Sequence, residues 1–301
     1  MKPLDLASGD LVADRRADYA EMLFKAGEHA AAVEVMLAAL ELAPGWALGW
    51  FRLGEMAEAG GSLRQAREAW QTVLKLDPAD RPGAALKLEL IGALPASKAP
   101  PGAFVEALFD QYAPTFDQAL VERLGYRVPE LLERAIVGTG RTFDSVVDLG
   151  CGTGLMGERL RPLARRLEGI DLSAAMLRRA TARGCYDRLL KADLQTAELP
   201  QADLVVAADV FMYLGALDGI FARVAAALRP GGLFAFSVEA HDGPEPFVLR
   251  ASRRYAHGEA GLRVGLATAG LTVLGLARET IRTDRGAPLE GFVVLAGRRH
   301  P

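Results

Sequence analysis

The chain reads Val147-Asp148-Leu149-Gly150-Cys151-Gly152-Thr153-Gly154 where an apolar run meets a glycine-rich turn. This pattern predicts a strand ending near Leu149, a turn whose bare backbone can approach a ligand closely, and a helix starting near Leu155. A dinucleotide-binding fingerprint needs a third glycine where this chain has Leu155. Asp148 would repel a pyrophosphate, whereas it would attract an ammonium group. The stretch therefore favours a ligand with a cationic end over a nicotinamide cofactor.

Apolar runs alternate with amphipathic segments around this stretch, which predicts a parallel sheet flanked by helices. We expect seven strands, near residues 145–149, 166–171, 188–192, 204–208, 233–238, 272–281 and 291–296. Because only a short polar turn at residues 283–286 joins the last two, five parallel strands should precede an antiparallel pair. Residues 241–258 show no strand pattern. Their Arg250, Arg253 and Arg254 belong either to a lid that binds an acidic substrate or to a charged surface helix.

Acidic residues follow three further strands, at the edge where open sheets bind ligands. Asp171 is placed to accept hydrogen bonds from ribose hydroxyls, Asp193 from an adenine amine, and Asp209 lies beside the site. A ligand with an amino acid end, a ribose and an adenine fits these positions, and S-adenosylmethionine is such a ligand. Two alternative interpretations without a ligand stay open. In the first, Asp148 has no role other than to cap the turn that follows it, and in the second, Asp171 and Ser173 have no role other than to cap a helix.

The first eighty residues contain an internal repeat. Four pairs of residues are each separated by 34 positions: Gly27 and Gly61, Ala32 and Ala66, Leu40 and Leu74, Pro44 and Pro78. Small alanines let two helices approach, and bulky Met36 and Trp70 fill the space beside them. This part resembles tetratricopeptide repeats, with Arg16 where a tryptophan is usual, and a capping helix is expected at residues 82–94. Two repeats are fewer than the roughly three that a free-standing solenoid needs.

Composition and linkers complete the domain prediction. A proline-rich run, Pro95–Pro101, predicts a stiff linker, so we expect a helical module over residues 1–95, a linker over 96–103 and a second domain over 104–301. A net charge of −3 argues against a dedicated nucleic-acid binder. Two cysteines without a histidine cluster predict no metal site, and Cys151 is expected to be a small core residue. No signal peptide or membrane span is predicted, which favours a cytoplasmic protein.

Residues 104–299 resemble class I S-adenosylmethionine-dependent methyltransferases, and the whole chain resembles the bacterial members that carry tetratricopeptide repeats. The matching pieces are Phe109–Asp117, Asp148–Gly154, Gly169–Ser173, Ala192–Leu194, Leu228–Gly232 and Arg254–His257. The resemblance implies a Rossmann-like α/β sheet of seven strands, S-adenosylmethionine as cofactor and S-adenosylhomocysteine as product. It also implies that Phe116 replaces a tyrosine found in many members, so that only packing remains there.

The resemblance further implies which residues bind the cofactor. Asp148, Gly150 and Gly152 would hold the methionine end and Asp171 and Leu172 the ribose. Asp193 and Leu194 would flank the adenine, Ala208 and Asp209 would line the methyl side, and Tyr112 would lie over the cofactor.

The acceptor also has to be positioned and, if it carries O–H or N–H, deprotonated. The candidate catalytic residues are His241, Glu239, Tyr255 and His257, and Tyr213 is a further candidate after the fourth strand. A histidine in a loop is more often simply hydrogen-bonded than a base. The chain lacks the Pro-Pro-Tyr and Pro-Cys patterns of nucleic-acid and glutamine methylation, which favours a small-molecule acceptor.

Three functions remain open from the sequence. The preferred one is methyl transfer to an oxygen or nitrogen of a small molecule, with the repeats as an accessory. The second is methylation of a protein recruited by the repeats, which deletion of residues 1–95 would abolish. The third is a scaffold that binds the cofactor without turnover, in which the repeats bind a protein or a second copy of the chain.

Overall fold

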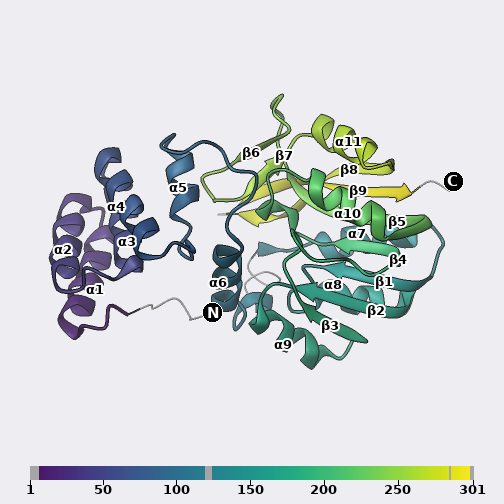
Figure 1. The fold of residues 1–301 in the computed structure, drawn as a ribbon, viewed down its shortest axis with the longest axis horizontal. Coiled ribbons are helices and arrows are strands. Elements are labelled where there is room, and N and C mark those ends of the chain that lie inside the picture. Colours follow the sequence, from purple (N-terminus) through teal and green to yellow (C-terminus); the bar gives the residue numbers. More distant parts are fainter. Residues whose placement is uncertain (1–6, 119–123, 285, 299–301) are drawn as a thin grey trace. The chain divides into compact units, whose positions relative to one another are not determined.

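The computed structural model describes residues 7–118, 124–284 and 286–298. It separates into two compact units, Met1–Ala107 and Leu108–Pro301, with the boundary inside helix α6 (Gly102–Tyr112) (Figure 1). Each unit has its own buried core, so each is described by itself.

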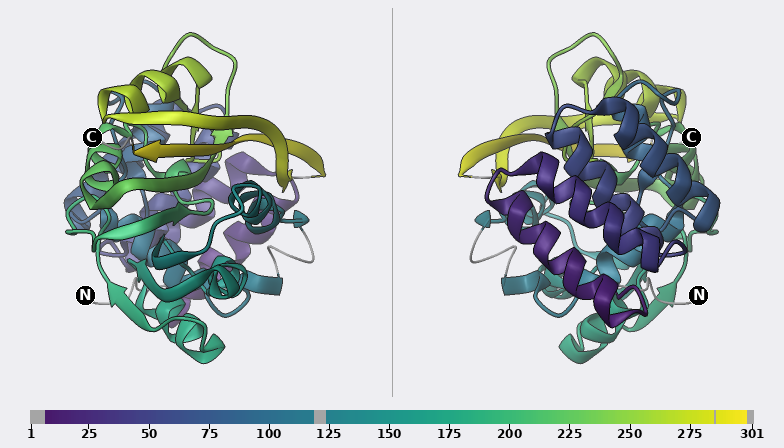
Figure 2. Two further views of the ribbon diagram at one scale, coloured as in Figure 1. Left: turned by 90° about the vertical axis from the view of Figure 1, so that its right-hand side faces the viewer. Right: turned by 90° about the vertical axis from the view of Figure 1, so that its left-hand side faces the viewer.

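The first unit is entirely helical. It contains α1 (Leu11–Lys25), α2 (His29–Leu42), α3 (Ala47–Ala59), α4 (Leu63–Leu76) and α5 (Ala84–Leu90). Helices α1 and α2 pack as one pair and α3 and α4 as the next, which Figure 2 (right) shows face on. The glycines that end α1 and α3, Gly27 and Gly61, have φ of +84° and +80°. The same left-handed geometry 34 residues apart explains why glycine recurs there.

Close helix packing in this unit depends on small residues opposite large ones. Ala32 and Ala66 are fully buried, as are Met36 and Trp70. A Cβ atom at Gly54 would lie only 2.2 Å from the Trp70 indole nitrogen, so only glycine fits there. Helix α5 lies within the segment expected to form a capping helix but is shorter than that segment.

The second unit alternates strands with helices. After α7 (Val128–Val137) come β1 (Phe143–Leu149), α8 (Leu155–Leu160), β2 (Ala164–Asp171), α9 (Ala174–Arg183), β3 (Arg188–Lys191), β4 (Ala202–Ala207), α10 (Asp218–Ala227), β5 (Leu228–Ala240), β6 (Phe247–Leu249), β7 (Tyr255–His257), α11 (Glu259–Thr268), β8 (Leu271–Asp284) and β9 (Ala287–Arg298). Short 3₁₀ helices follow α8 (Arg161–Leu163) and β4 (Phe211–Tyr213).

These strands form one mixed sheet. Strands β3, β2, β1, β4 and β5 are parallel neighbours in that order. Strand β9 pairs antiparallel with β5 and β8 antiparallel with β9, and this long hairpin is yellow in Figure 2 (left). The prediction of five parallel strands followed by an antiparallel pair is confirmed.

The predicted total of seven strands is wrong, because the sheet formed by the described residues has nine. Strands β6 and β7 form a hairpin in residues 241–258, where no strand was expected, and β7 also pairs in parallel with the end of β5 through Glu239 and Ala240. Each of the two strands has only three residues. Three residues are too few to show the alternation that marks a strand.

Two apolar layers cover the sheet. Helices α10 and α11 pack on one face, where Phe211, Phe221, Phe234 and Phe236 form a connected group of rings, and α7 and α8 pack on the other. Nowhere in the described residues is a helix both long and apolar enough to cross a membrane. The layers leave the carboxyl ends of the parallel strands as the edge at which polar residues gather.

Candidate active site

The glycine turn after β1 has the geometry that its sequence requires. Gly150, Gly152 and Gly154 have φ of +65°, +54° and +95°, a region that favours glycine. A Cβ atom at Gly150 would lie 2.5 Å from Val210, so the position also has no room for a side chain. The predicted strand, turn and helix are present, with α8 starting at Leu155.

Asp148 is a fully buried carboxylate at this turn. Its Oδ2 accepts a hydrogen bond of 2.7 Å from the Tyr186 hydroxyl, whereas its Oδ1 has no partner within the described part of the chain. Burial, more than the nearby charge of Asp171, raises the pKa of Asp148 to about 7. An unpartnered buried carboxylate oxygen costs free energy until a donor reaches it. A ligand ammonium would supply both the donor and the charge.

Asp171 connects β2 to the glycine turn. Its Oδ2 accepts from the Gly152 amide and its Oδ1 from the Ser173 amide, each at 2.8 Å. Ser173 caps α9 by accepting from the Met176 amide, so the capping interpretation holds for Ser173. Asp171 does more than cap, because it holds the turn against β2. Burial raises its pKa to about 6, and its carboxylate oxygens keep lone pairs for two ribose hydroxyls.

The Phe109–Asp117 segment is anchored beside this turn by two carboxylates. Asp110 accepts from the Ser173 hydroxyl at 2.5 Å, and Asp117 accepts from the Thr153 hydroxyl and from Arg183. Arg183 also donates to the Thr153 carbonyl at 2.7 Å. The Tyr112 side chain is 51% exposed, so the structure leaves it free to cover a ligand. The Phe116 ring packs edge-on against the Phe109 ring.

Four predicted cofactor residues flank these carboxylates. Asp193 is half-buried after β3, and its Oδ1 accepts from the Gln195 amide, so it closes a local turn. Leu172, Leu194 and Ala208 are half-buried at the ends of β2, β3 and β4. All four therefore lie at the predicted edge of the sheet.

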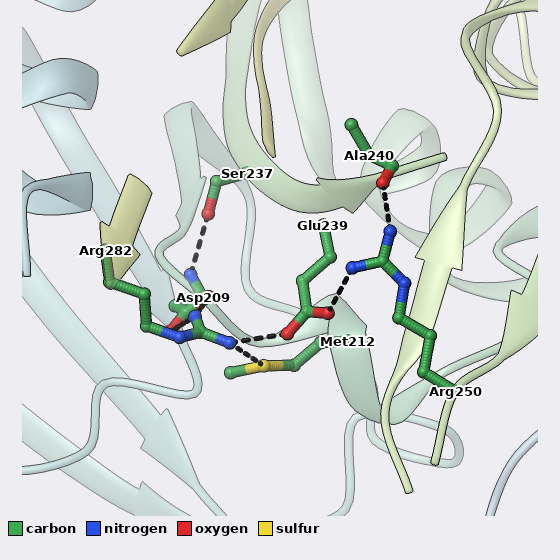
Figure 3. A network of polar contacts seen from close by, with 7 residues as sticks. All are labelled: Asp209, Met212, Ser237, Glu239, Ala240, Arg250 and Arg282. Atoms are coloured by element: carbon green, nitrogen blue, oxygen red, sulfur yellow. Dashed lines mark hydrogen bonds and ion pairs between the residues drawn. The ribbon is translucent and has the colours of Figure 1, made fainter. Parts of the chain in front are cut away.

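Asp209 belongs to a buried ion-pair network that joins three elements (Figure 3). Arg282 of β8 donates to both Asp209 oxygens, at 2.7 and 2.6 Å, and to Glu239 of β5 at 2.5 Å. The Asp209 backbone has φ of +60°, and its amide donates to the Ser237 hydroxyl. The strained backbone is held by contacts on both sides, which fixes the direction of the chain after β4.

Glu239 lies between two arginines. Its other oxygen is 3.4 Å from Arg250, which also donates to the Ala240 carbonyl at 2.6 Å. Burial raises the pKa of Glu239, while Arg282 acts in the opposite direction. Glu239 is thus bound on both oxygens.

Tyr213 and Arg254 form a second polar contact at this edge. The Arg254 guanidinium donates to the Tyr213 hydroxyl, and burial raises the pKa of that tyrosine. The Tyr213 ring packs edge-on against Phe109 at 5.2 Å. Tyr255 is almost completely buried, with its ring 5.7 Å from Phe247.

Both predicted catalytic histidines are engaged by backbone groups. His241 Nδ1 accepts from the Gly243 amide at 2.9 Å, so its Nε2 donates to the Glu245 carbonyl. His257 is 2% exposed, its Nε2 donates to the Leu214 and Gly215 carbonyls, and burial lowers its pKa to about 4. The structure therefore brings His257, Glu239 and Asp209 to one edge and gives His241 a local structural contact.

Several residues of the site have no signal in the local sequence. Tyr186 and Arg183 lie near the end of α9, 38 and 30 residues from their partners Asp148 and Thr153. Arg282 lies 73 residues from Asp209. No local sequence pattern predicts pairs so far apart in the chain. Asp110 and Asp117 belong to the Phe109–Asp117 motif, which by itself assigns them no role. No group of three or more metal-ligating side chains is found among residues 7–118, 124–284 and 286–298.

Comparison with known proteins found methyltransferases that are similar to this chain. Residues 147–234 match the family described as "Methyltransferase domain". The matched residues run from β1 into β5 and include the glycine turn. The fold of the chain resembles that of a 1,6-didemethyltoxoflavin-N1-methyltransferase from Burkholderia thailandensis, with a TM-score of 0.53, 21% identity, and coverage of 68% of this chain and 93% of that one.

Two curated relatives are similar to parts of this chain. The malonyl-[acyl-carrier protein] O-methyltransferase of Yersinia pestis is 32% identical over 140 residues, which are 44% of this chain and 49% of the relative. The trans-aconitate 2-methyltransferase of Paracidovorax citrulli is 39% identical over 100 residues, 31% of this chain and 38% of the relative. The chain thus spans less than half the length of these relatives.

Proposed function

We propose that this protein transfers the methyl group of S-adenosylmethionine to an oxygen or nitrogen atom of a small molecule. The observation that carries the proposal is the unpartnered Oδ1 of Asp148, buried beside a turn whose glycines leave the backbone bare. The residues present fit the cofactor. Asp148 would accept from its ammonium, Asp171 from its ribose hydroxyls, and Gly150 and Gly152 would leave room for its methionine part.

The cofactor supplies a sulfonium methyl group that a nucleophile can displace. The protein's part is to hold the acceptor in line with it and to exclude water. Residues 109–117 are suited to cover the cofactor, because Asp110 and Asp117 fasten them to α9 and to the glycine turn. The two curated relatives are named as methyltransferases acting on malonyl-[acyl-carrier protein] and on trans-aconitate, and the second of these names supports a small-molecule acceptor.

Calorimetric titration with S-adenosylhomocysteine tests the cofactor site. We expect saturable binding with one site per chain, weakened at least tenfold by Asp171→Ala, since the substitution removes two amide contacts and the ribose acceptor. Asp144→Ala, at an exposed position of β1, is the matched control and should leave the affinity unchanged. Absence of binding by the unchanged protein would refute the proposal.

The first unit is proposed to be an accessory module of the tetratricopeptide type. Its paired helices, the repeated left-handed Gly27 and Gly61, and the Gly54–Trp70 packing support this assignment. Such a module would bind a protein partner or a second copy of the chain. Sedimentation of the purified protein, with and without Gly54→Ala, tests self-association: a monomer at all concentrations would leave only the partner role.

A further inference from the structure

The polar cluster after β4 and β5 carries an excess of positive charge. Asp209 and Glu239 are its two carboxylates, whereas Arg250, Arg254 and Arg282 contribute three guanidinium groups. Arg282 and Arg250 bind the carboxylates (Figure 3). Within residues 7–118, 124–284 and 286–298, Arg254 has no carboxylate within ion-pair distance, and its side-chain partner is the neutral Tyr213 hydroxyl.

The β6–β7 hairpin holds Arg254 in a defined place. The Arg250 amide donates to the Arg254 carbonyl at 2.9 Å, and the Arg253 amide to the Arg250 carbonyl at 2.8 Å. These bonds close a tight turn that carries both arginines back to the end of β5. A half-buried guanidinium held in this way, on which Glu239 acts only from beyond ion-pair distance, is a pre-organised site for a carboxylate.

A chain of contacts connects Arg254 to the cofactor residues. Arg254 contacts Tyr213, whose ring lies 5.2 Å from that of Phe109. The next residue, Asp110, binds the Ser173 hydroxyl beside Asp171. Burial raises the pKa of Tyr126, and the charges of Asp209, Arg282 and Asp148 also act on it. The ion-pair network of Asp209 and the glycine turn after Asp148 are therefore both close to the Tyr126 side chain. Arg254 therefore lies on the side of the cofactor site that follows β4.

The described side chains at this edge are poorly suited to take a proton from an acceptor with an O–H or N–H group. His241 has both nitrogens engaged, whereas His257 Nδ1 has no partner among the described residues but is a weak base, because burial lowers the pKa of His257 to about 4. Glu239 is bound to two arginines, and Tyr213 has its pKa raised. An acceptor that is already ionised at neutral pH needs no base.

From these observations we infer that the acceptor is a carboxylic acid, bound through Arg254 and methylated on a carboxylate oxygen. This inference rests on the proposed function. The carboxylate oxygen forms a bond to the methyl carbon, the carbon–sulfur bond breaks, and its electron pair stays on sulfur. The sulfonium becomes a thioether and the carboxylate a methyl ester, so no proton is transferred.

The test uses the full-length protein and methyl-labelled S-adenosylmethionine. A metabolite extract is divided by anion exchange into retained and unretained fractions, and each is incubated with the enzyme. We expect label in the retained fraction only, released as methanol by alkali, because methyl esters hydrolyse and methyl amines and ethers do not. Label in the unretained fraction, alkali-stable label, or no label in the retained fraction would each overturn the inference.

Arg254→Gln identifies the binding residue. With the retained fraction as substrate, the KM for the acceptor should rise at least tenfold in this variant, while the affinity for S-adenosylhomocysteine stays unchanged. The KM of Arg254→Lys should lie between those of Arg254→Gln and the unchanged protein. Arg263→Gln, on the exposed side of α11, is the control and should behave as the unchanged protein. An unaltered KM in Arg254→Gln would exclude this arginine. If the protein without substitutions does not bind S-adenosylhomocysteine, the proposed function itself is refuted.

Discussion

Asp148 shows how a single residue can serve binding at the expense of stability. Its pKa is about 7 in the folded protein and 3.8 for an ordinary aspartate, so the folded state binds an extra proton between these values. Stability contributed by this residue is therefore fully present below about pH 4 and is lost as pH rises through 7. The cofactor ammonium compensates for this loss when it binds.

Asp148→Asn should therefore stabilise the ligand-free protein and abolish cofactor binding. A buried amide costs less than a buried charge, and we expect the melting temperature of the variant at pH 8 to exceed that of the unchanged protein by about 2–8 °C. The difference should shrink toward pH 5. Thermal melts between pH 5 and 8 measure it, and an unchanged difference across that range would contradict the assignment.

The same carboxylate should make cofactor affinity depend on pH. Ligand binding requires ionised Asp148, so the dissociation constant for S-adenosylhomocysteine should rise up to about tenfold per pH unit below 7. Calorimetry from pH 5.5 to 8 tests this. Tyr186→Phe removes the hydroxyl that favours the ionised form, so it should move the midpoint to higher pH while leaving affinity at pH 9 nearly unchanged. A shared midpoint for both proteins would show that Tyr186 does not position Asp148.

At the scale of elements, Arg282 fastens β8 to β5 and to the turn after β4. Arg282→Met leaves Asp209 and Glu239 buried without their main partner, at a cost of about 3–5 kcal/mol. Urea unfolding followed by circular dichroism measures this cost. Arg134→Gln breaks the exposed pair with Glu279 and should cost less than about 1 kcal/mol. Equal effects of the two substitutions would contradict the role of the buried network.

At the scale of the whole molecule, the two units should respond separately to substitutions in their cores. Gly54→Ala forces a Cβ atom against Trp70 and should destabilise the first unit by about 1–3 kcal/mol without changing S-adenosylhomocysteine affinity. Gly45→Ala, where a Cβ atom meets nothing within 4 Å, is the control in the same unit. Differential scanning calorimetry should show one transition shifted and the other unchanged. A shift of both transitions would mean that the units unfold together.

Local sequence patterns predict the order of the elements, apart from the β6–β7 hairpin. The Asp148–Gly154 stretch, the alternation of apolar runs and the short turn at 283–286 predicted the glycine turn, five parallel strands and an antiparallel pair. These features are local, because left-handed backbone requires glycine and a short turn permits only a hairpin.

Which side chains meet depends on the tertiary fold. Tyr186 on Asp148, Arg282 on Asp209 and Arg254 on Tyr213 are pairs far apart in the chain, brought together by the crossing of helices and strands. It also bound both nitrogens of His241 and the Nε2 of His257 to backbone groups and gave the three-residue strand β7 its partner in β5. Burial and pairing depend on long-range packing, and a sequence pattern records only what neighbours along the chain require.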